Sequence, residues 1–205
     1  LVLLGQIVDR YGLDLPNGIL LPQLLTSLSE IEGLERIRFL TSHPNWMTDD
    51  LIDAVAALPK VMPHIEVPVQ AGDDEILLAM RRGYSNQGYR DLIARIRDRI
   101  PDVSIGTDII VGFPGESVVA FEQTYKLLED LKLDVAHLAR YSPRPNTYSA
   151  KFLPDDVPAE EKMRRFRALE DLQKQVVGEI NQKFLDQSQP VLFEGKSKDR
   201  WRGRT

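Results

Sequence analysis

The fold is decided by residues 103–116, which read VSIGTDIIVGFPGE. The first part, Val103–Val111, is an apolar and β-branched run that predicts a buried strand. Gly112–Glu116 follows with two glycines and a proline, which favour a loop, and apolar residues beyond it recur at helical spacing. The stretch therefore predicts a strand, a glycine-rich loop and a helix, in that order.

The same unit recurs along the chain. Similar runs occur at Leu1–Leu4, Ile37–Leu40, Ile65–Val69 and Val135–Leu138, and segments of helical period lie between them. Strand starts roughly 30 to 40 residues apart favour a parallel sheet with crossover helices, either an open doubly wound sheet or a full or partial (βα) barrel. We expect the partial barrel, because unusual polar and glycine residues follow every run at the same end.

A long amphipathic helix is predicted to begin at Pro158 and to end near Ser188, because apolar residues recur every three or four positions from Met163 to Phe184. Pro190–Glu194 then reads as a strand with a basic tail, Lys196–Thr205. We expect two units: residues 1–187 as the barrel core with its helix, and residues 188–205 as the start of a small β domain. The chain starts at Leu1 and is interpreted as an excised piece.

Composition excludes several classes of protein. The 205 residues include no cysteine and carry a formal net charge of −5. Without cysteine this chain has no disulfide, no cysteine nucleophile and no cysteine-held iron–sulfur cluster. It has neither an apolar run of the roughly 20 residues that cross a bilayer nor a secretory signal, so a cytoplasmic protein is expected. The acidic balance restricts any nucleic-acid contact to local patches, of which the basic tail is the clearest.

A shared pocket is predicted at the strand ends, where parallel α/β folds carry their ligand sites. Each apolar run is followed by a polar or glycine-rich cluster: Gly5-Gln6, Ser42-His43-Pro44, Gln70–Asp73, Gly112–Glu116 and Tyr141–Pro145.

Three features in or beside these clusters each have two interpretations. Gly112 and Gly115 would let a purine or pyrophosphate approach the backbone, or would only make a tight turn. Gln70 could bond a ribose or carboxylate, or could cap its own loop. A buried Asp108 would bind a hydroxyl-rich ligand, or would pair with Arg95 or Arg97.

Other catalytic classes receive little support. His43, His64 and His137 are scattered without metal-ligand spacing, so no metal site is predicted. Ser42 and Ser142 lack the context of a nucleophilic serine. The run Arg164–Arg167 interrupts the apolar stripe of its helix and is interpreted as a solvated face.

Five ordered motifs resemble the radical S-adenosylmethionine methylthiotransferases. They are residues 3–6 (LLGQ), 36–44 (RIRFLTSHP), 67–72 (VPVQAG) with 80–84 (MRRGY), 107–116 (TDIIVGFPGE) and 141–147 (YSPRPNT). The resemblance runs from residue 1 to the end of the chain, and residues 109–116 are its most specific part.

The resemblance implies a partial radical SAM barrel followed by a small RNA-binding β domain. Family members bind S-adenosylmethionine and two [4Fe–4S] clusters, and they transfer a methylthio group to an unactivated carbon, a step that needs a cofactor. This chain lacks the C-x-x-x-C-x-x-C loop, so we expect no cluster, no metal ligand and no catalytic side chain here, and no activity from the chain alone. The motifs most resemble the branch that acts on isopentenylated adenosine beside the tRNA anticodon, with the threonylcarbamoyladenosine branch as the alternative.

Site residues are carried over from the family position by position. Gly5 and Gln6 occupy the place that binds the methionine amino group, and Gln70 and Gly72 the place of ribose or carboxylate contacts. Asp108 is a polar partner in the same pocket. The adenine slot is implied for Ile110, Gly112 and Phe113, and Tyr141 lies at the last strand end. The RNA contacts implied are Arg144, Lys196, Lys198, Arg200 and Arg202, although Arg144 could instead form a loop ion pair.

Two other classes of protein also fit the sequence. A non-catalytic RNA-binding module would use the basic tail and the barrel rim. A phosphate-binding barrel isomerase or aldolase would grip phosphate with Gly112–Glu116, but the strand ends lack a Schiff-base lysine and paired carboxylates. The sequence leaves the oligomeric state undetermined.

Overall fold

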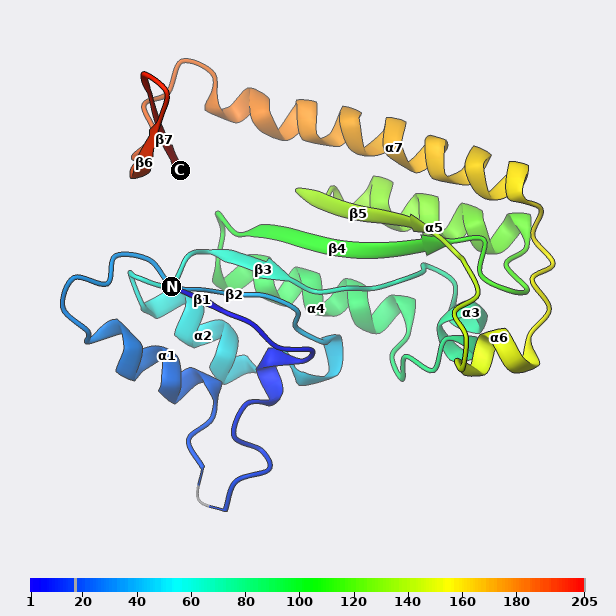
Figure 1. The fold of residues 1–205 in the computed structure, drawn as a ribbon, viewed down its shortest axis with the longest axis horizontal. Coiled ribbons are helices and arrows are strands. Elements are labelled where there is room, and N and C mark those ends of the chain that lie inside the picture. Colours follow the sequence, from blue (N-terminus) through cyan, green and yellow to red (C-terminus); the bar gives the residue numbers. More distant parts are fainter. Residues whose placement is uncertain (17, 205) are drawn as a thin grey trace.

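A curved parallel sheet forms the centre of the molecule (Figure 1). The computed structural model describes residues 1–16 and 18–204. The parallel strands are β1 (Val2–Leu3), β2 (Arg38–Phe39), β3 (His64–Glu66), β4 (Ser104–Val111) and β5 (Val135–Arg140). β1 pairs with β2, and β3 with β4 and β5 in that order. The two groups are joined by a bridge between Ile37 and Val61 and by a 3.1 Å hydrogen bond from the Ser42 N–H to the Glu66 carbonyl.

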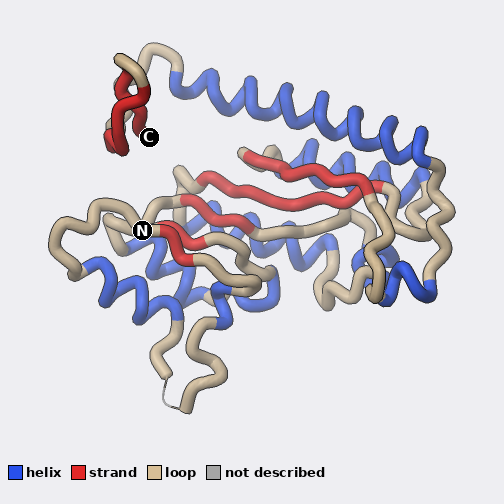
Figure 2. The backbone as a smooth tube through the Cα atoms, in the orientation of Figure 1, coloured by secondary structure: helices blue, strands red, loops and turns tan. Residues whose placement is uncertain are grey.

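Helices connect successive strands and cover one face of the sheet (Figure 2). They are α1 (Leu21–Ser29), α2 (Asp49–Ala57), α3 (Asp74–Ala79), α4 (Asn86–Arg99), α5 (Val118–Leu131), α6 (Tyr148–Phe152) and α7 (Ala159–Asn181), with short 3₁₀ turns η1 (Val8–Arg10), η2 (Pro44–Trp46) and η3 (Gln182–Phe184). Thr48 caps α2, because its hydroxyl accepts the Leu51 N–H at 3.3 Å.

The two faces of the sheet differ in burial. On β4, Ile105, Ile109 and Val111 are fully buried against the helices, whereas Asp108 and Ile110 on the opposite face stay half-exposed. This period-2 alternation places the apolar core between sheet and helices and leaves the opposite face partly accessible. The predicted α/β partial barrel is therefore confirmed.

After the barrel core, α7 packs against β5 and α5. It begins after Pro158 as predicted, but it ends at Asn181 with a 3₁₀ turn to Phe184 and does not reach Ser188. The chain then forms an antiparallel hairpin of β6 (Leu192–Ser197) and β7 (Arg200–Arg204). This hairpin lies beside the amino ends of the parallel strands, where the Arg36 guanidinium donates to the Arg204 carbonyl at 3.0 Å. Within the described ranges no helix has both the length and the apolar character needed to span a bilayer.

The interpretation of Arg164–Arg167 as a solvated face is wrong for one member. Arg165 is only 3% exposed. Its guanidinium donates to the Glu116 carboxylate at 2.7 Å and to Glu161 at 2.8 Å. The helix face that carries Arg165 turns toward the loop after β4, so the charge is buried with a partner.

Candidate functional site

The carboxyl ends of the parallel strands lie along one end of the sheet, which we call the rim (Figure 1). Because the strands are parallel, the loop that follows each of them starts there. All five polar and glycine-rich clusters predicted from the sequence begin at this rim.

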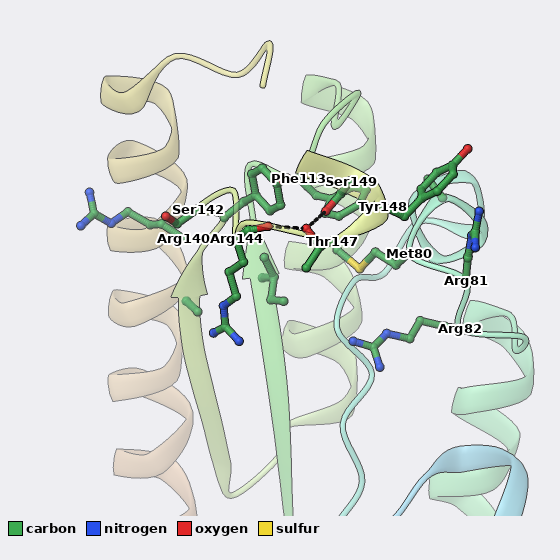
Figure 3. Close-up of a pocket in the computed structure, with 14 residues that line it drawn as sticks. Met80, Arg81, Arg82, Phe113, Arg140, Ser142, Arg144, Thr147, Tyr148 and Ser149 are labelled. Carbon is green, nitrogen blue, oxygen red and sulfur yellow. Dashed lines mark hydrogen bonds between the residues drawn. The ribbon is translucent and has the colours of Figure 1, made fainter. Parts of the chain in front are cut away.

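A cavity of 380 Å³ opens at the rim beyond β4 and β5. Ile110, Phe113, Tyr141 and Arg144, four of the residues predicted to contact cofactor or RNA, line it together with residues 79–82 and the start of α6 (Figure 3). The Phe113 and Tyr141 rings meet edge to face with centroids 5.1 Å apart. The lining combines an apolar, aromatic floor with guanidinium groups, a combination that suits a ligand with a flat ring and negative charge.

The loop after β4 is held in place from α7. Gly112 has a φ of +70°, and a Cβ there would lie 2.3 Å from Cγ of Lys162. Its N–H donates to the Glu116 carboxylate at 2.6 Å, and that carboxylate is bound to Arg165. Burial raises the pKa of Glu116, against the opposing effect of Arg165. Gly112 therefore contributes its backbone to the loop and is packed under Lys162.

Lys162 links the same loop to the end of β5. Its ammonium group pairs with Asp155, donates to the Tyr141 carbonyl at 3.4 Å and lies 5.1 Å from the Tyr141 ring centroid. Two cations of α7 thus fix both loops that border the cavity.

Gln70 and Gly72 lie behind the cavity and not among its lining residues. Gln70 is 7% exposed and has a φ of +75°, while its N–H donates to the Asp108 carbonyl and its carbonyl accepts from the Ile110 N–H. The Gly72 N–H donates to the Thr124 hydroxyl at 2.8 Å, and a Cβ at Gly72 would lie 2.6 Å from Thr124 Cα. In this structure both residues hold the loop after β3 against β4 and α5.

Asp108 lies on the open face of β4, in register with His137 of β5. Burial raises the pKa of its carboxyl group, and His137 and Arg82 act in the opposite direction. The predicted alternative of an ion pair with Arg95 or Arg97 is wrong. Arg95 binds Asp49 at 3.2 Å and Arg97 donates to the Lys132 carbonyl, because α4 packs against the other face of the sheet.

The remaining predicted residues lie away from the cavity. Gly5 and Gln6 follow β1 at the same rim, where Gln6 is exposed in a shallow depression with Arg10. Lys196, Lys198, Arg200 and Arg202 are exposed on the hairpin, at the opposite end of the strands from Arg144 (Figure 1).

Two residues at the rim were missed by the sequence reasoning. Arg82 lines the cavity, and its Nε is buried without a hydrogen-bond partner among the described residues. Asp9 accepts the His43 N–H at 2.9 Å, and burial raises its pKa to about 6. Arg82 belongs to the MRRGY motif, which could have indicated it, but no sequence signal marks Asp9.

Comparison with known proteins identifies the class. The family model of the Radical SAM superfamily matches residues 12–128. The chain therefore belongs to the radical SAM superfamily, and the resemblance seen in its motifs is confirmed.

The relatives define a narrower group. Proteins named tRNA-2-methylthio-N(6)-dimethylallyladenosine synthase are 54% identical over 204 residues in Dehalococcoides mccartyi strain CBDB1 and 56% identical over 208 residues in Roseiflexus sp. strain RS-1. Both alignments cover 100% of this chain, but only 49% and 44% of the relatives. The chain thus spans about half the length of the curated relatives it matches.

Solved structures share the fold at low identity. Coproporphyrinogen III oxidase from Escherichia coli superimposes with a TM-score of 0.59 at 18% identity, over 75% of this chain and 36% of that one. A radical S-adenosylmethionine methyltransferase from Kitasatospora setae gives 0.52 at 17% identity, over 63% and 26%.

The two kinds of cofactor that the family implies fit this chain differently. The cavity volume lies in the range of about 300–1,000 Å³ typical of small-molecule sites, and its aromatic floor fits the adenosine part of S-adenosylmethionine. An iron–sulfur cluster does not fit, since the chain has no cysteine. The described residues also include no group of three or more histidines or carboxylates that could hold a metal.

Proposed function

We propose that this chain is the S-adenosylmethionine-binding and RNA-facing part of a methylthiotransferase that acts on N6-dimethylallyladenosine in tRNA, in the anticodon loop. The observation that carries the proposal is that proteins named for this reaction match the chain along its whole length at 54–56% identity. Their name favours the dimethylallyl substrate over the threonylcarbamoyl alternative. A tRNA substrate makes the cytoplasm the expected location.

S-adenosylmethionine would bind in the cavity at the ends of β4 and β5. Ile110 and Phe113 offer an apolar floor for the adenine, and Tyr141 closes one side against the Phe113 ring. When bound, S-adenosylmethionine supplies the methyl group and the radical chemistry. The residues of this chain bind the cofactor, orient it and exclude water; the cluster that reduces it would have to be held by cysteines outside this chain.

The test is a replacement experiment. The 208-residue segment of the Roseiflexus enzyme that aligns with this chain would be exchanged for the chain, and the chimera reconstituted with iron and sulfide. We expect methylthiolated dimethylallyladenosine in a tRNA substrate, measured by mass spectrometry of the digested RNA. A folded, cluster-containing chimera that binds S-adenosylmethionine and leaves this substrate unmodified would contradict the proposal, and modification only of threonylcarbamoyladenosine would support the other branch.

A matched pair of variants tests the cofactor site. Phe113→Ala removes part of the cavity floor and is expected to weaken S-adenosylmethionine binding about tenfold in equilibrium dialysis, as the loss of one aromatic contact would. Phe193→Ala removes an exposed ring of β6 at the other end of the strands and should leave binding unchanged. Equal effects of the two changes would show that the cofactor binds elsewhere.

A further inference from the structure

Five arginines at the rim form no ion pair with any described residue, although the chain carries a net charge of −5. They are Arg10, Arg81, Arg82, Arg140 and Arg144, of which Arg140 also lines a depression along α7. On the helices, Arg90, Arg95, Arg99 and Arg165 pair with carboxylates, whereas Arg97 and Arg167 pair with no carboxylate of the described residues. Asp14 shares a depression with Arg10 without pairing with it. Arg36, Arg38, Arg200 and Arg202 at the opposite end of the strands also form no ion pair with a described residue, but most of the unpaired rim arginines line the cavity, and unneutralised guanidinium groups around a cavity indicate an anionic partner.

Two of these guanidinium groups lie over exposed aromatic rings. Arg10 lies 4.7 Å from the Trp46 ring centroid, and Arg81 lies 3.8 Å from that of Tyr148. Trp46 is 37% exposed and Tyr148 46% exposed. A guanidinium group that lies over an exposed ring offers bases both a cationic and an aromatic surface on which to stack, and such surfaces are typical of single-stranded RNA recognition.

The two stacked pairs are connected by contacts across the rim. The Asn45 amide, next to Trp46, donates to the Gly83 carbonyl at 2.9 Å, and Gly83 follows Arg81 and Arg82. The His43 and Tyr84 rings meet edge to face beside this bond, with centroids 5.4 Å apart. We call the set of rim residues Arg10, Trp46, Arg81, Arg82, Tyr148 and Arg144 the arginine strip.

The strip borders the cavity. Figure 3 shows Arg82 and Arg144 extending from the rim toward the same open space, whereas Arg81 turns away to Tyr148. Arg144 is held by its neighbour, since the Thr147 hydroxyl donates to the Arg144 carbonyl at 2.8 Å. The basic hairpin lies at the opposite end of the strands, so it is badly placed to hold nucleotides beside the cavity (Figure 1).

We propose that the arginine strip is a docking surface for unpaired RNA, in which bases stack at Arg10–Trp46 and Arg81–Tyr148 while Arg82 and Arg144 contact phosphates. The inference rests on the proposed function in taking RNA as the partner. It goes further by assigning the main contacts to the barrel itself and, Arg144 apart, to residues for which neither the motifs nor the relatives' names specify a role.

The test is equilibrium binding of the chain to a fluorescent RNA hairpin with a single-stranded loop, without S-adenosylmethionine. Trp46→Leu and Tyr148→Leu keep apolar volume and remove the stacking face, and each should weaken binding about tenfold. The double change Arg82→Gln/Arg144→Gln should weaken binding at least as much and should lower the slope of log affinity against log salt by about 2, one for each phosphate contact. Arg167→Gln is the matched control, because Arg167 is an exposed arginine of α7 with no ion pair among the described residues, and it should change affinity less than about twofold.

The proposal is overturned if the strip variants bind like Arg167→Gln, or if only Lys196→Gln/Lys198→Gln in the hairpin weakens binding. It is also overturned if a blunt duplex of equal charge binds as tightly as the loop, since a duplex offers no free base to stack. Thermal melting of every variant separates lost binding from lost folding. The RNA-binding measurement requires neither iron–sulfur clusters nor catalytic turnover. An inactive chimera would therefore contradict the proposed reaction, whereas the arginine strip is tested by the RNA affinities alone.

Discussion

At the scale of single residues, Asp9 shows how the rim alters an ordinary carboxyl group. One oxygen accepts the His43 N–H, and the other is buried without a partner among the described residues. Burial raises the pKa of Asp9 from 3.8 to about 6. Between these two values the folded chain binds more protons at this position than the unfolded chain, so the contribution of Asp9 to stability falls as pH rises through that window.

Asp9→Asn removes this titration and keeps an oxygen for the His43 N–H. We expect the free energy of unfolding of the variant, relative to the original chain, to increase by roughly 1 kcal/mol between pH 4 and pH 7, after allowance for partial solvent screening. Urea denaturation at both pH values measures the difference. Parallel pH profiles for the two proteins would show that Asp9 titrates normally.

Two glycines of the loop after β4 make a matched comparison. Gly112 and Gly115 both have a left-handed backbone, with φ of +70° and +82°. A Cβ at Gly112 would meet Lys162, whereas a Cβ at Gly115 has nothing within 4 Å. Gly115→Ala should therefore lower the free energy of unfolding by about 1–2 kcal/mol from backbone strain alone, and Gly112→Ala by at least about 1 kcal/mol more from overpacking. Equal losses in chemical denaturation would mean that Lys162 moves aside without cost.

At the scale of elements, the buried pair of Glu116 and Arg165 ties α7 to the loop beside the cavity. Removing one partner leaves the other charge buried, so Arg165→Met should lower the free energy of unfolding by about 3–5 kcal/mol. The double change Glu116→Gln/Arg165→Met should recover much of that loss, because no charge then remains buried. A double-mutant cycle in urea measures the coupling, and additive losses would contradict the pairing.

Most helices and strands could be predicted from the local sequence pattern, but the side-chain partners that they meet in the folded structure could not. Apolar period and capping residues such as Thr48 and Pro158 locate the strands and helices to within a few residues. The sequence predicts a solvent-exposed Arg165, because its partner Glu116 is 49 residues away in sequence and comes into contact only when α7 folds back onto the loop after β4. The predicted pairing of Asp108 with Arg95 or Arg97 fails for a similar reason. Which face of a helix meets the sheet is decided by tertiary packing.

At the scale of the whole molecule, the prediction that all clusters share one end follows from parallel strands alone. Their division could not be foreseen: Phe113 and Tyr141 line the cavity, Gln70 and Gly72 hold a loop behind it, and Gln6 lies in another depression. Strand order and the depth of each loop determine this division, and both depend on contacts between distant segments.

The open edge of the sheet affects the behaviour of the molecule in solution. Within residues 1–16 and 18–204, β1 pairs only with β2, and Leu4 beside it is 76% exposed. Apolar edge strands favour association, and an edge lysine opposes it. Leu4→Lys should therefore reduce concentration-dependent association in sedimentation velocity, whereas Leu78→Lys on α3, at a position 78% exposed, should not. If both variants lower association equally, general surface apolarity and not the edge is responsible.

Gln70 adopts a backbone conformation that glycine would tolerate with about 1–2 kcal/mol less strain. A laboratory selection for thermal stability alone would therefore favour Gln70→Gly. The selected variants would have a higher free energy of unfolding and a more flexible loop after β3. Screening one library for both thermal stability and S-adenosylmethionine binding would show whether the amide side chain of Gln70, which lies outside the cavity lining, contributes to either property.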